Sequence, residues 1–229
     1  MIIRAILFDL DDTLYLEKEF FQSGFAVVAA ELEARGIGSA GEIQILLERI
    51  HLGEGRERVL NKAAARLPFP ESWVGELVDR FRAHAPKIQI QPEDYEVLRC
   101  LRQQYRLGCI TDGFSAVQRR KIQALGIQDF FNALVIADEL GRQYWKPHPL
   151  PFLTCCQQLQ VPPAQAVFVG DHPERDIQGA RRAGLTSIRI RREQSYFFYR
   201  VSSGPERADF EISRLSELEG ILQHLQGKA

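Results

Sequence analysis

Three carboxylates follow the first apolar segment of the chain within four residues. The run from Ile6 to Phe8 leads directly into Asp9, and Asp11 and Asp12 come next. Unpaired charge costs several kcal/mol to bury, so core packing does not explain these acids. Oxygen ligands at the end of a strand suit a hard divalent cation, and Mg²⁺ with a phosphate is the usual combination. The segment therefore predicts a cation at this point.

Two later apolar segments also end in residues that can contact a phosphate or a cation, namely Thr111, Asp112 and Gly113 in the middle of the chain and Gly170 and Asp171 nearer its end. A hydroxyl and the backbone amides of a turn opened by glycine can hold phosphoryl oxygens. A carboxylate in such a place can hold a cation. The elements that carry these residues decide whether they meet.

Helical and strand-like apolar segments alternate from Pro92 onward. After a first strand over 2–9, the pattern predicts helices over 93–105, 115–125, 150–159, 174–183 and 213–225, and strands over 107–111, 133–136, 166–170, 186–190 and 210–212. Such alternation is typical of an α/β fold with a doubly wound, mostly parallel, Rossmann-like sheet. Ligands of these sheets bind at the carboxyl ends of the strands, so we expect Asp9, Asp11, Thr111 and Asp171 to meet at one edge.

Residues 16–85 have a different character, because every convincing segment in this stretch has helical periodicity. Apolar residues recur at helical spacing, for example at Ile43 and Leu47. The sequence therefore predicts an all-helical subdomain over 16–85, inserted into an α/β core that consists of 1–15 and 86–229.

The composition disfavours several classes of function. The formal net charge is -1, from 29 basic and 30 acidic residues, which gives no long-range field to attract nucleic acid. No apolar run approaches the roughly 18 residues needed to span a bilayer, and the N-terminal residues lack the layout of a signal peptide. We therefore expect no nucleic-acid partner, no membrane contact and a cytoplasmic location.

The cysteines lack CxxC spacing and are expected to be core thiols, at Cys100, Cys109, Cys155 and Cys156.

Four motifs of the chain resemble, in order and in context, those of the haloacid dehalogenase-like hydrolase superfamily. They are Asp9-x-Asp11-x-Thr13, Thr111-Asp112-Gly113, Lys146-Pro147, and Gly170-Asp171 followed after four residues by Asp176. The resemblance spans the whole chain and includes a helical cap inserted after the first motif, as in the phosphatase branch.

The resemblance implies a reaction centred on the first motif. Asp9 would attack phosphorus and form an aspartyl phosphate, which splits hydrolysis into two easier displacements. Asp11 would protonate the leaving oxygen and then deprotonate the attacking water. Because Asp9 and the phosphoryl group are both negative, Mg²⁺ is the implied cofactor. Its implied ligands are Asp9, Asp171 and the backbone carbonyl of Asp11.

The other motif residues have supporting roles in this hypothesis. Thr111, Asp112 and Gly113 would bind phosphoryl oxygens through a hydroxyl and backbone amides. Lys146 would neutralise the nucleophile and a phosphate oxygen. Asp176 would belong to the metal site, where it would reach the ion through water or orient another ligand. A cap at the start of the helix that carries Asp176 is the competing interpretation.

Residues 53–58 interrupt the helical pattern of the insert with two glycines and two arginines. In relatives with this kind of cap, a loop between cap helices reaches into the active site. Arg56 and Arg58 are therefore candidates for contact with an anionic group of the substrate. An ordinary polar turn between two helices is the alternative.

These inferences predict a Mg²⁺-dependent phosphatase that hydrolyses a small phosphorylated metabolite, as a monomer or a homodimer. A phosphomutase of the same fold would reuse the intermediate and stays an alternative. A 2-haloacid dehalogenase is disfavoured, because members that cleave carbon–halogen bonds typically lack an acid at the position of Asp11. A non-catalytic phosphate-responsive module is disfavoured because Asp9, Asp11, Lys146 and Asp171 are all present.

Overall fold

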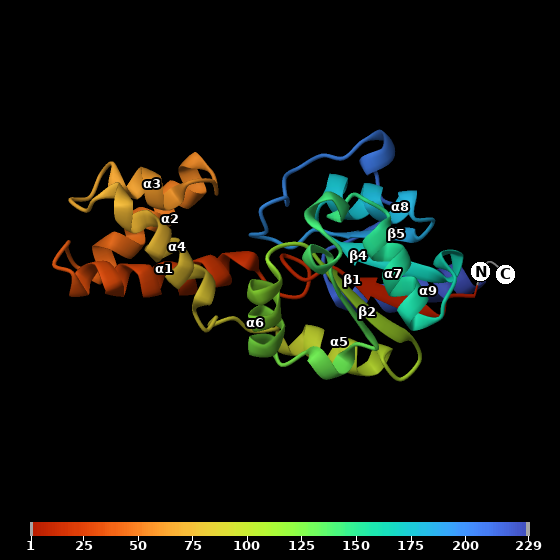
Figure 1. Cartoon of the computed structure of the whole chain (residues 1–229). Helices are drawn as coiled ribbons and strands as arrows, with labels where there is room; N and C mark the ends of the chain where they lie inside the picture. Colours follow the sequence, from red (N-terminus) through yellow and green to blue (C-terminus); the bar gives the residue numbers. More distant parts are fainter. Residues whose placement is uncertain (1, 228–229) are drawn as a thin grey trace. The chain divides into compact units, whose positions relative to one another are not determined.

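The computed structural model describes residues 2–227 of the chain. It divides into two compact units (Figure 1). The first, which we call the core unit, comprises Met1–Glu17 and Gln89–Ala229. The second, which we call the helical unit, is the unbroken stretch Lys18–Ile88.

One parallel sheet forms the centre of the core unit. Its described strands lie in the order β3-β2-β1-β4-β5-β6, and they are β1 (Ala5–Phe8), β2 (Arg106–Thr111), β3 (Ala133–Ile136), β4 (Ala166–Gly170), β5 (Thr186–Ile190) and β6 (Phe210–Ile212). Strand β1 is central, because Ala5 pairs with Arg106 of β2 on one side and with Ala166 of β4 on the other. All four residues of β1 are buried.

Helices cover both faces of this sheet, and they are α5 (Pro92–Leu101), α6 (Ser115–Leu125), α7 (Leu150–Leu159), α8 (Gly179–Arg182) and α9 (Leu218–Gly227). The chain places β2 and β3 on one side of β1 and then crosses to β4 on the other. Right-handed crossovers in opposite directions put α5 and α6 on one face and α7 and α8 on the other (Figure 1). The predicted doubly wound, parallel α/β fold is confirmed.

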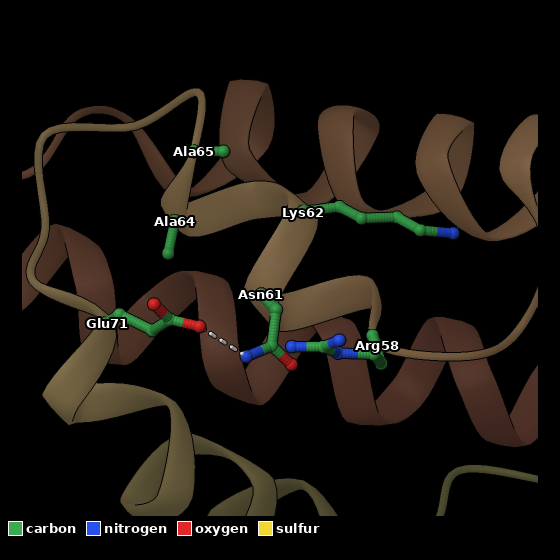
Figure 2. Close-up of a pocket in the computed structure, with 6 residues that line it drawn as sticks. All are labelled: Arg58, Asn61, Lys62, Ala64, Ala65 and Glu71. Atoms are coloured by element: carbon green, nitrogen blue, oxygen red, sulfur yellow. Dashed lines mark hydrogen bonds between the residues drawn. The ribbon is translucent and has the colours of Figure 1, made fainter.

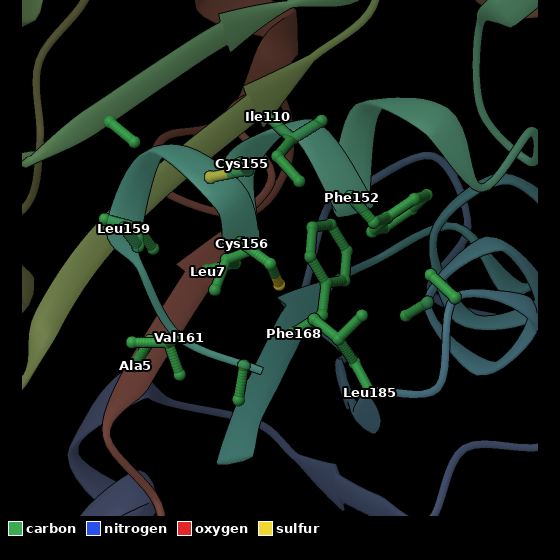
Figure 3. Packing of buried hydrophobic residues seen from close by; sticks show 14 of the residues in the cluster. Ala5, Leu7, Ile110, Phe152, Cys155, Cys156, Leu159, Val161, Phe168 and Leu185 are labelled. Carbon is green, nitrogen blue, oxygen red and sulfur yellow. The ribbon is translucent and has the colours of Figure 1, made fainter. Parts of the chain in front are cut away.

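The face of the sheet under α7 shows why the apolar segments become buried strands. Leu7 of β1 and Phe168 of β4 pack there against Phe152 and the cysteines of α7 (Figure 3). The rings of Phe152 and Phe168 meet edge to face, with centroids 4.8 Å apart. Such contacts between large apolar side chains dominate core energetics.

The prediction of four core thiols holds for three. Cys109, Cys155 and Cys156 are buried and reduced, whereas Cys100 is exposed. The buried positions of α5 are Asp94, Leu98 and Leu101, and this helical stripe leaves residue 100 on the solvent side. The expectation for Cys100 was therefore wrong.

The segment after β4 departs from a regular helix. A helix was predicted over 174–183, but Pro173–Gln178 forms a π-helical turn before α8 begins. The amides of Asp176 and Ile177 both donate to the carbonyl of His172, at 2.9 and 3.3 Å. Wide turns of this kind are frequent at functional sites.

The regular elements described for the helical unit are all helices. The α-helices are α1 (Glu17–Ala34), which starts at the last residue of the preceding core segment, α2 (Ala40–Glu54), α3 (Val59–Ala64) and α4 (Val74–Ala83), and a short 3-10 helix spans Glu71–Trp73. They enclose a hydrophobic cluster of their own, which includes Leu32, Leu47 and Leu77. The role of this unit as a cap stays a prediction. Within residues 2–227, no helix combines the length and the apolar character that a membrane crossing requires.

Candidate active site

Neighbouring strand ends bring the predicted acids together. Strands β1 and β4 are paired in register up to Phe8 and Val169, and the amide of Asp9 continues this ladder by donating to the carbonyl of Val169 at 2.9 Å. Asp171 follows β4 by one residue. Asp9, Asp171 and Asp176 can each offer one carboxylate oxygen, and these oxygens all lie within 4.8 Å of one another.

Asp176 reaches this group because Gly170 has no side chain. A Cβ atom on residue 170 would lie 2.7 Å from Cβ of Asp176. The Asp176 carboxylate accepts hydrogen bonds from the amide of His172 at 2.9 Å and from Nζ of Lys146 at 2.6 Å. It therefore does more than complement a helix dipole, because it also pairs with a buried cation.

Lys146 lies between two of the acids. Its Nζ is 2.5 Å from Oδ1 of Asp9 and 2.6 Å from Oδ1 of Asp176. Burial alone would lower the pKa of Lys146, but the charges of Asp176 and Asp9 outweigh burial and hold this pKa above its ordinary value. Lys146 is therefore an ammonium at neutral pH, in contact with the predicted nucleophile.

The acids outnumber the cation in this buried cluster. Burial, opposed by Lys146 and reinforced by Asp176, raises the pKa of Asp9 to about 8. Burial and the charges of Asp176 and Asp9 raise the pKa of Asp171 well above its ordinary value. Oδ2 of Asp171 is buried and has no hydrogen-bond partner among the described residues. An excess of negative charge and an unsatisfied carboxylate oxygen fit a hard divalent cation such as Mg²⁺.

Asp11 has its own set of hydrogen-bond donors. Its Oδ1 accepts from the hydroxyl of Tyr15 and from Nζ of Lys121, the latter at 2.7 Å. Its Oδ2 accepts from Nε2 of Gln118 at 2.9 Å. Burial would raise the pKa of Asp11, but Lys121 and these hydrogen bonds outweigh it and hold the pKa below its ordinary value. Burial and the charge of Asp11 raise the pKa of Tyr15, so its hydroxyl stays a donor.

Sequence reasoning missed Tyr15, Gln118 and Lys121. The signal for two of them lies in the periodicity of α6, whose buried residues are Gln118, Lys121, Ile122 and Leu125. An amide and an ammonium on the apolar stripe of a helix are unusual, because burying them without partners is costly. That anomaly marks residues that need a polar partner inside the core.

The second motif contacts helix α6 and the third motif. Thr111 ends β2, and its hydroxyl oxygen accepts a hydrogen bond from Nε2 of Gln118. Oδ1 of Asp112 accepts from the backbone amide of Lys146 at 3.2 Å, which ties the second motif to the third. Gly113 has a φ of +114°, which favours glycine, and a Cβ there would lie 3.4 Å from Cδ of Gln118. Thr111, Asp112 and Gly113 thus gather beside Lys146, while their contact with a phosphate stays a proposal.

The carboxylate of Asp12 is hydrogen-bonded to the backbone of two separate segments and is shielded from solvent. Its side chain is buried and accepts from the amide of Glu17 at 2.9 Å and from the amide of Tyr196 at 3.1 Å. The backbone of Asp12 has a φ of +56°. Asp12 therefore joins the turn after β1 to the loop after β5.

His172 caps the turn that carries Asp176. Its Nδ1 accepts from the amide of Arg175 at 3.2 Å, and its ring packs on Phe197, with centroids 4.1 Å apart. Burial and the charge of Arg175 lower the pKa of His172 to about 3, so the ring is neutral at physiological pH.

The loop that carries Phe197 is anchored by Arg189, a buried residue of β5. The guanidinium donates to the carbonyl of Asp171 at 3.1 Å and to the carbonyl of Phe197 at 2.7 Å. The backbone beside the predicted metal site and the loop after β5 are therefore fixed to the same side chain.

The two predicted substrate-binding arginines lie between α2 and α3, within the helical unit. Arg56 is half-buried, with its guanidinium 5.9 Å from the ring centroid of Phe21. Arg58 is exposed and lines a pocket together with Asn61 and Lys62 (Figure 2). The contacts described above for Arg56 and Arg58 are with residues of the helical unit. Their contact with a substrate therefore stays a proposal.

A family model described as a haloacid dehalogenase-like hydrolase matches residues 3–184. The chain belongs to the haloacid dehalogenase-like hydrolase family. It is 31% identical over 232 residues to a glyceraldehyde 3-phosphate phosphatase of Methanopyrus kandleri, covering 97% of this chain and 98% of that relative. It is 27% identical to the N-acylneuraminate-9-phosphatase of Homo sapiens, covering 99% and 96% of the two chains.

A solved structure of the family gives the same fold. The crystal structure described as a 2-haloacid dehalogenase from Pseudomonas syringae has a TM-score of 0.68 with this chain, at 27% identity, covering 98% of this chain and 100% of that one. The phosphatase relatives match over nearly their full length. Together with the family, they support a hydrolase that acts on phosphoric monoester bonds.

Proposed function

We propose that this member of the haloacid dehalogenase-like hydrolase family is a Mg²⁺-dependent phosphatase that works through an aspartyl phosphate on Asp9. The observation that carries the proposal is the convergence of Asp9, Asp171 and Asp176 within 4.8 Å, with Lys146 paired to two of them. Packing alone gives no reason to bury three acids beside one another. A bound Mg²⁺ would supply the positive charge that lets an anionic nucleophile approach an anionic ester.

The first step is a displacement at phosphorus. The carboxylate of Asp9 forms the new P–O bond, and the bond between phosphorus and the leaving oxygen breaks with its electron pair on that oxygen. Lys146, which holds Oδ1 of Asp9 at 2.5 Å, orients the nucleophile and lowers the repulsion between it and the phosphoryl oxygens. Asp11 donates a proton to the leaving oxygen. Because its donors favour the ionised form in the free protein, Asp11 would take up this proton when the anionic substrate binds beside it.

The second step releases phosphate. Asp11, now a carboxylate, takes a proton from a water molecule that attacks the aspartyl phosphate, so Asp9 and inorganic phosphate are regenerated. Thr111 ends β2, and the turn at Gly113 follows it. The hydroxyl of Thr111 and the amides of this turn would hold the phosphoryl oxygens through both steps. Asp11 therefore serves as acid and then as base.

Asp11 also separates this proposal from dehalogenation. A halide leaves without a proton, so a dehalogenase needs no acid two residues after its nucleophile. In this chain the Asp11 carboxylate is held by three side-chain donors, from Tyr15, Lys121 and Gln118. These donors stabilise the ionised form of Asp11, which is the form that takes a proton from water in the second step. The presence of an acid two residues after Asp9 supports a leaving group that must be protonated.

The substrate class follows from the relatives. One is described as acting on glyceraldehyde 3-phosphate and another on an N-acylneuraminate 9-phosphate. Both names place the phosphate on the terminal carbon of a hydroxylated carbon chain. We propose that this enzyme hydrolyses a phosphomonoester of that kind, and that Arg56 or Arg58 contacts an anionic group of the substrate.

Phosphate release from a panel of sugar phosphates and phosphorylated acids, with Mg²⁺ and with a chelator, tests the proposal. We expect turnover that requires Mg²⁺, and we expect Asp9→Asn to abolish it while the circular dichroism spectrum and the unfolding transition stay normal. Near-normal turnover by Asp9→Asn would remove the nucleophile assignment. Turnover that is unchanged by the chelator would remove the metal.

A further inference from the structure

Two buried polar residues of α6 are not explained by the packing of the core. Lys121 is 4% exposed and Gln118 is 1% exposed. They lie one helical turn apart, on the same stripe as Ile122 and Leu125. A buried ion pair is often no more stabilising than apolar side chains of similar volume. The burial of Lys121 and Gln118 therefore points to a task other than holding the fold together.

Both side chains converge on Asp11. Nζ of Lys121 is 2.7 Å from Oδ1, and Nε2 of Gln118 is 2.9 Å from Oδ2. The two donors thus hold different oxygens of one carboxylate. Gln118 also donates to the hydroxyl of Thr111, so it links the proposed acid and base to the residue proposed to hold the phosphoryl group.

We propose that Lys121 and Gln118 are positioning residues that fix the Asp11 carboxylate in the orientation from which it exchanges a proton with the leaving oxygen. This inference rests on the proposed role of Asp11. Two rotatable bonds separate the carboxylate from the backbone, and proton transfer requires heavy atoms within hydrogen-bond distance. Donors on both oxygens restrict those rotations before the substrate arrives.

Neighbouring residues contact the same group. Gly113, the last residue of the second motif, borders Gln118, because a Cβ at residue 113 would lie 3.4 Å from Cδ of Gln118. The hydroxyl of Tyr15 is a further donor to Oδ1 of Asp11. Lys121 and Tyr15 therefore hold one oxygen of Asp11, and Gln118 holds the other.

Two aryl phosphates of similar size test the inference. The leaving oxygen of 4-nitrophenyl phosphate needs little protonation, whereas that of phenyl phosphate is more basic and depends on an acid. With Mg²⁺ present, we expect Lys121→Met to lower the ratio of kcat/KM for phenyl over 4-nitrophenyl phosphate by roughly 10-fold or more. We expect Lys121→Arg to recover part of that ratio. Asp11→Asn marks the full loss.

Arg119→Met is the matched control, because Arg119 is an exposed cation of the same helix; it should leave the ratio unchanged. An unchanged ratio in Lys121→Met, or an equal fall for both esters, would overturn the inference and leave the proposed function standing. Should Lys121→Met fail to fold, Gln118→Leu is measured in its place, with the same two outcomes. A wild-type enzyme that hydrolyses neither these esters nor any compound of the sugar phosphate panel would overturn the proposed function and this inference with it.

Discussion

Gly170 and Asp176 touch so closely that no other residue fits at position 170, because an added Cβ atom would lie 2.7 Å from Cβ of Asp176. The contact involves the base of the Asp176 side chain, which cannot swing away as the end of a flexible chain could. The position of Asp176 in turn sets one of the two ion pairs of Lys146. We therefore expect activity to depend on Gly170, a residue that has no functional group.

Gly170→Ala tests this dependence. Overpacking of a tight interior typically costs about 1–3 kcal/mol, and we expect a loss of that size in the free energy of unfolding, together with a larger fall in kcat than in stability-matched variants elsewhere. Chemical denaturation and steady-state kinetics measure both. Gly75→Ala is the control: it lies on the exposed side of α4 with nothing within 4 Å, and alanine there should stabilise by roughly 0.5–1 kcal/mol.

Metal binding is expected to release a proton. Without metal, the folded protein holds protons that the unfolded chain loses, because the pKa of Asp9 rises from 3.8 to about 8 on folding. The stability that this group contributes is present below pH 3.8 and is lost as the pH rises to about 8. Mg²⁺ displaces the proton, so its binding enthalpy near pH 7 should vary with the ionisation enthalpy of the buffer.

The same site predicts stabilisation by the ion. At a concentration of 100 times its dissociation constant, Mg²⁺ should raise the free energy of unfolding by about 2.7 kcal/mol. Asp171→Asn, which removes the acid with an unpartnered oxygen, should abolish most of that gain and leave the metal-free protein at least as stable as the wild type. An Asp171→Asn protein that still gains full stability from Mg²⁺ would contradict the proposed ligand set.

Asp12 should matter for stability and little for chemistry. Its carboxylate accepts from two backbone amides, of Glu17 and of Tyr196, and each amide left unsatisfied costs roughly 1–3 kcal/mol. We expect Asp12→Ala to lower the unfolding midpoint while it retains far more turnover than Asp9→Asn. Asp129→Ala, at an exposed turn, is the control. A loss of turnover equal to that of Asp9→Asn would give Asp12 a part in the reaction.

The arginines of the helical unit should affect selection of the substrate. Arg58→Ala and Arg56→Ala are expected to raise KM or to change the ranking of substrates in the panel, because each removes a cation that can pair with an anionic group. Arg58 is the more accessible of the two. Arg66→Ala, which removes an exposed arginine paired with Glu54, serves as the control. Unchanged kinetics in both single variants would exclude this loop from recognition.

The sequence was most informative where apolar periodicity and the alternation of strands and helices indicate the same element. The strands over 133–136, 166–170, 186–190 and 210–212 and the helices over 115–125 and 150–159 were predicted with the bounds that the structure has. Short apolar runs between amphipathic helices leave few alternatives once the parallel sheet is inferred. Because such a sheet gathers strand ends at one edge, Asp9, Thr111 and Asp171 were expected together before any coordinates.

Sequence reasoning failed where a polar side chain occupies a position that the apolar periodicity of its helix assigns to the core. Lys121 and Gln118 occupy the buried stripe of α6, where periodicity alone suggests core packing, and their partner Asp11 is more than a hundred residues away in the chain. The π-helical turn at Pro173–Gln178 was predicted as ordinary helix, because no local signal distinguishes the two. Long-range hydrogen bonds explain the first case, whereas the wide turn is held by local hydrogen bonds to the carbonyl of His172.

The pairing of Ala5 with Ala166 also bears on how the chain is made. Strand β1 leaves the ribosome before the other strands of the sheet. The edge of β1 that pairs with β4 stays unpaired until residues 166–170 have been synthesised. The stretch Lys18–Ile88 is contiguous and can bury its apolar faces during that delay. A nascent chain halted before β4 would expose the open edge of β1 to other strands, so truncated translation products of this protein should need chaperones more than the finished enzyme does.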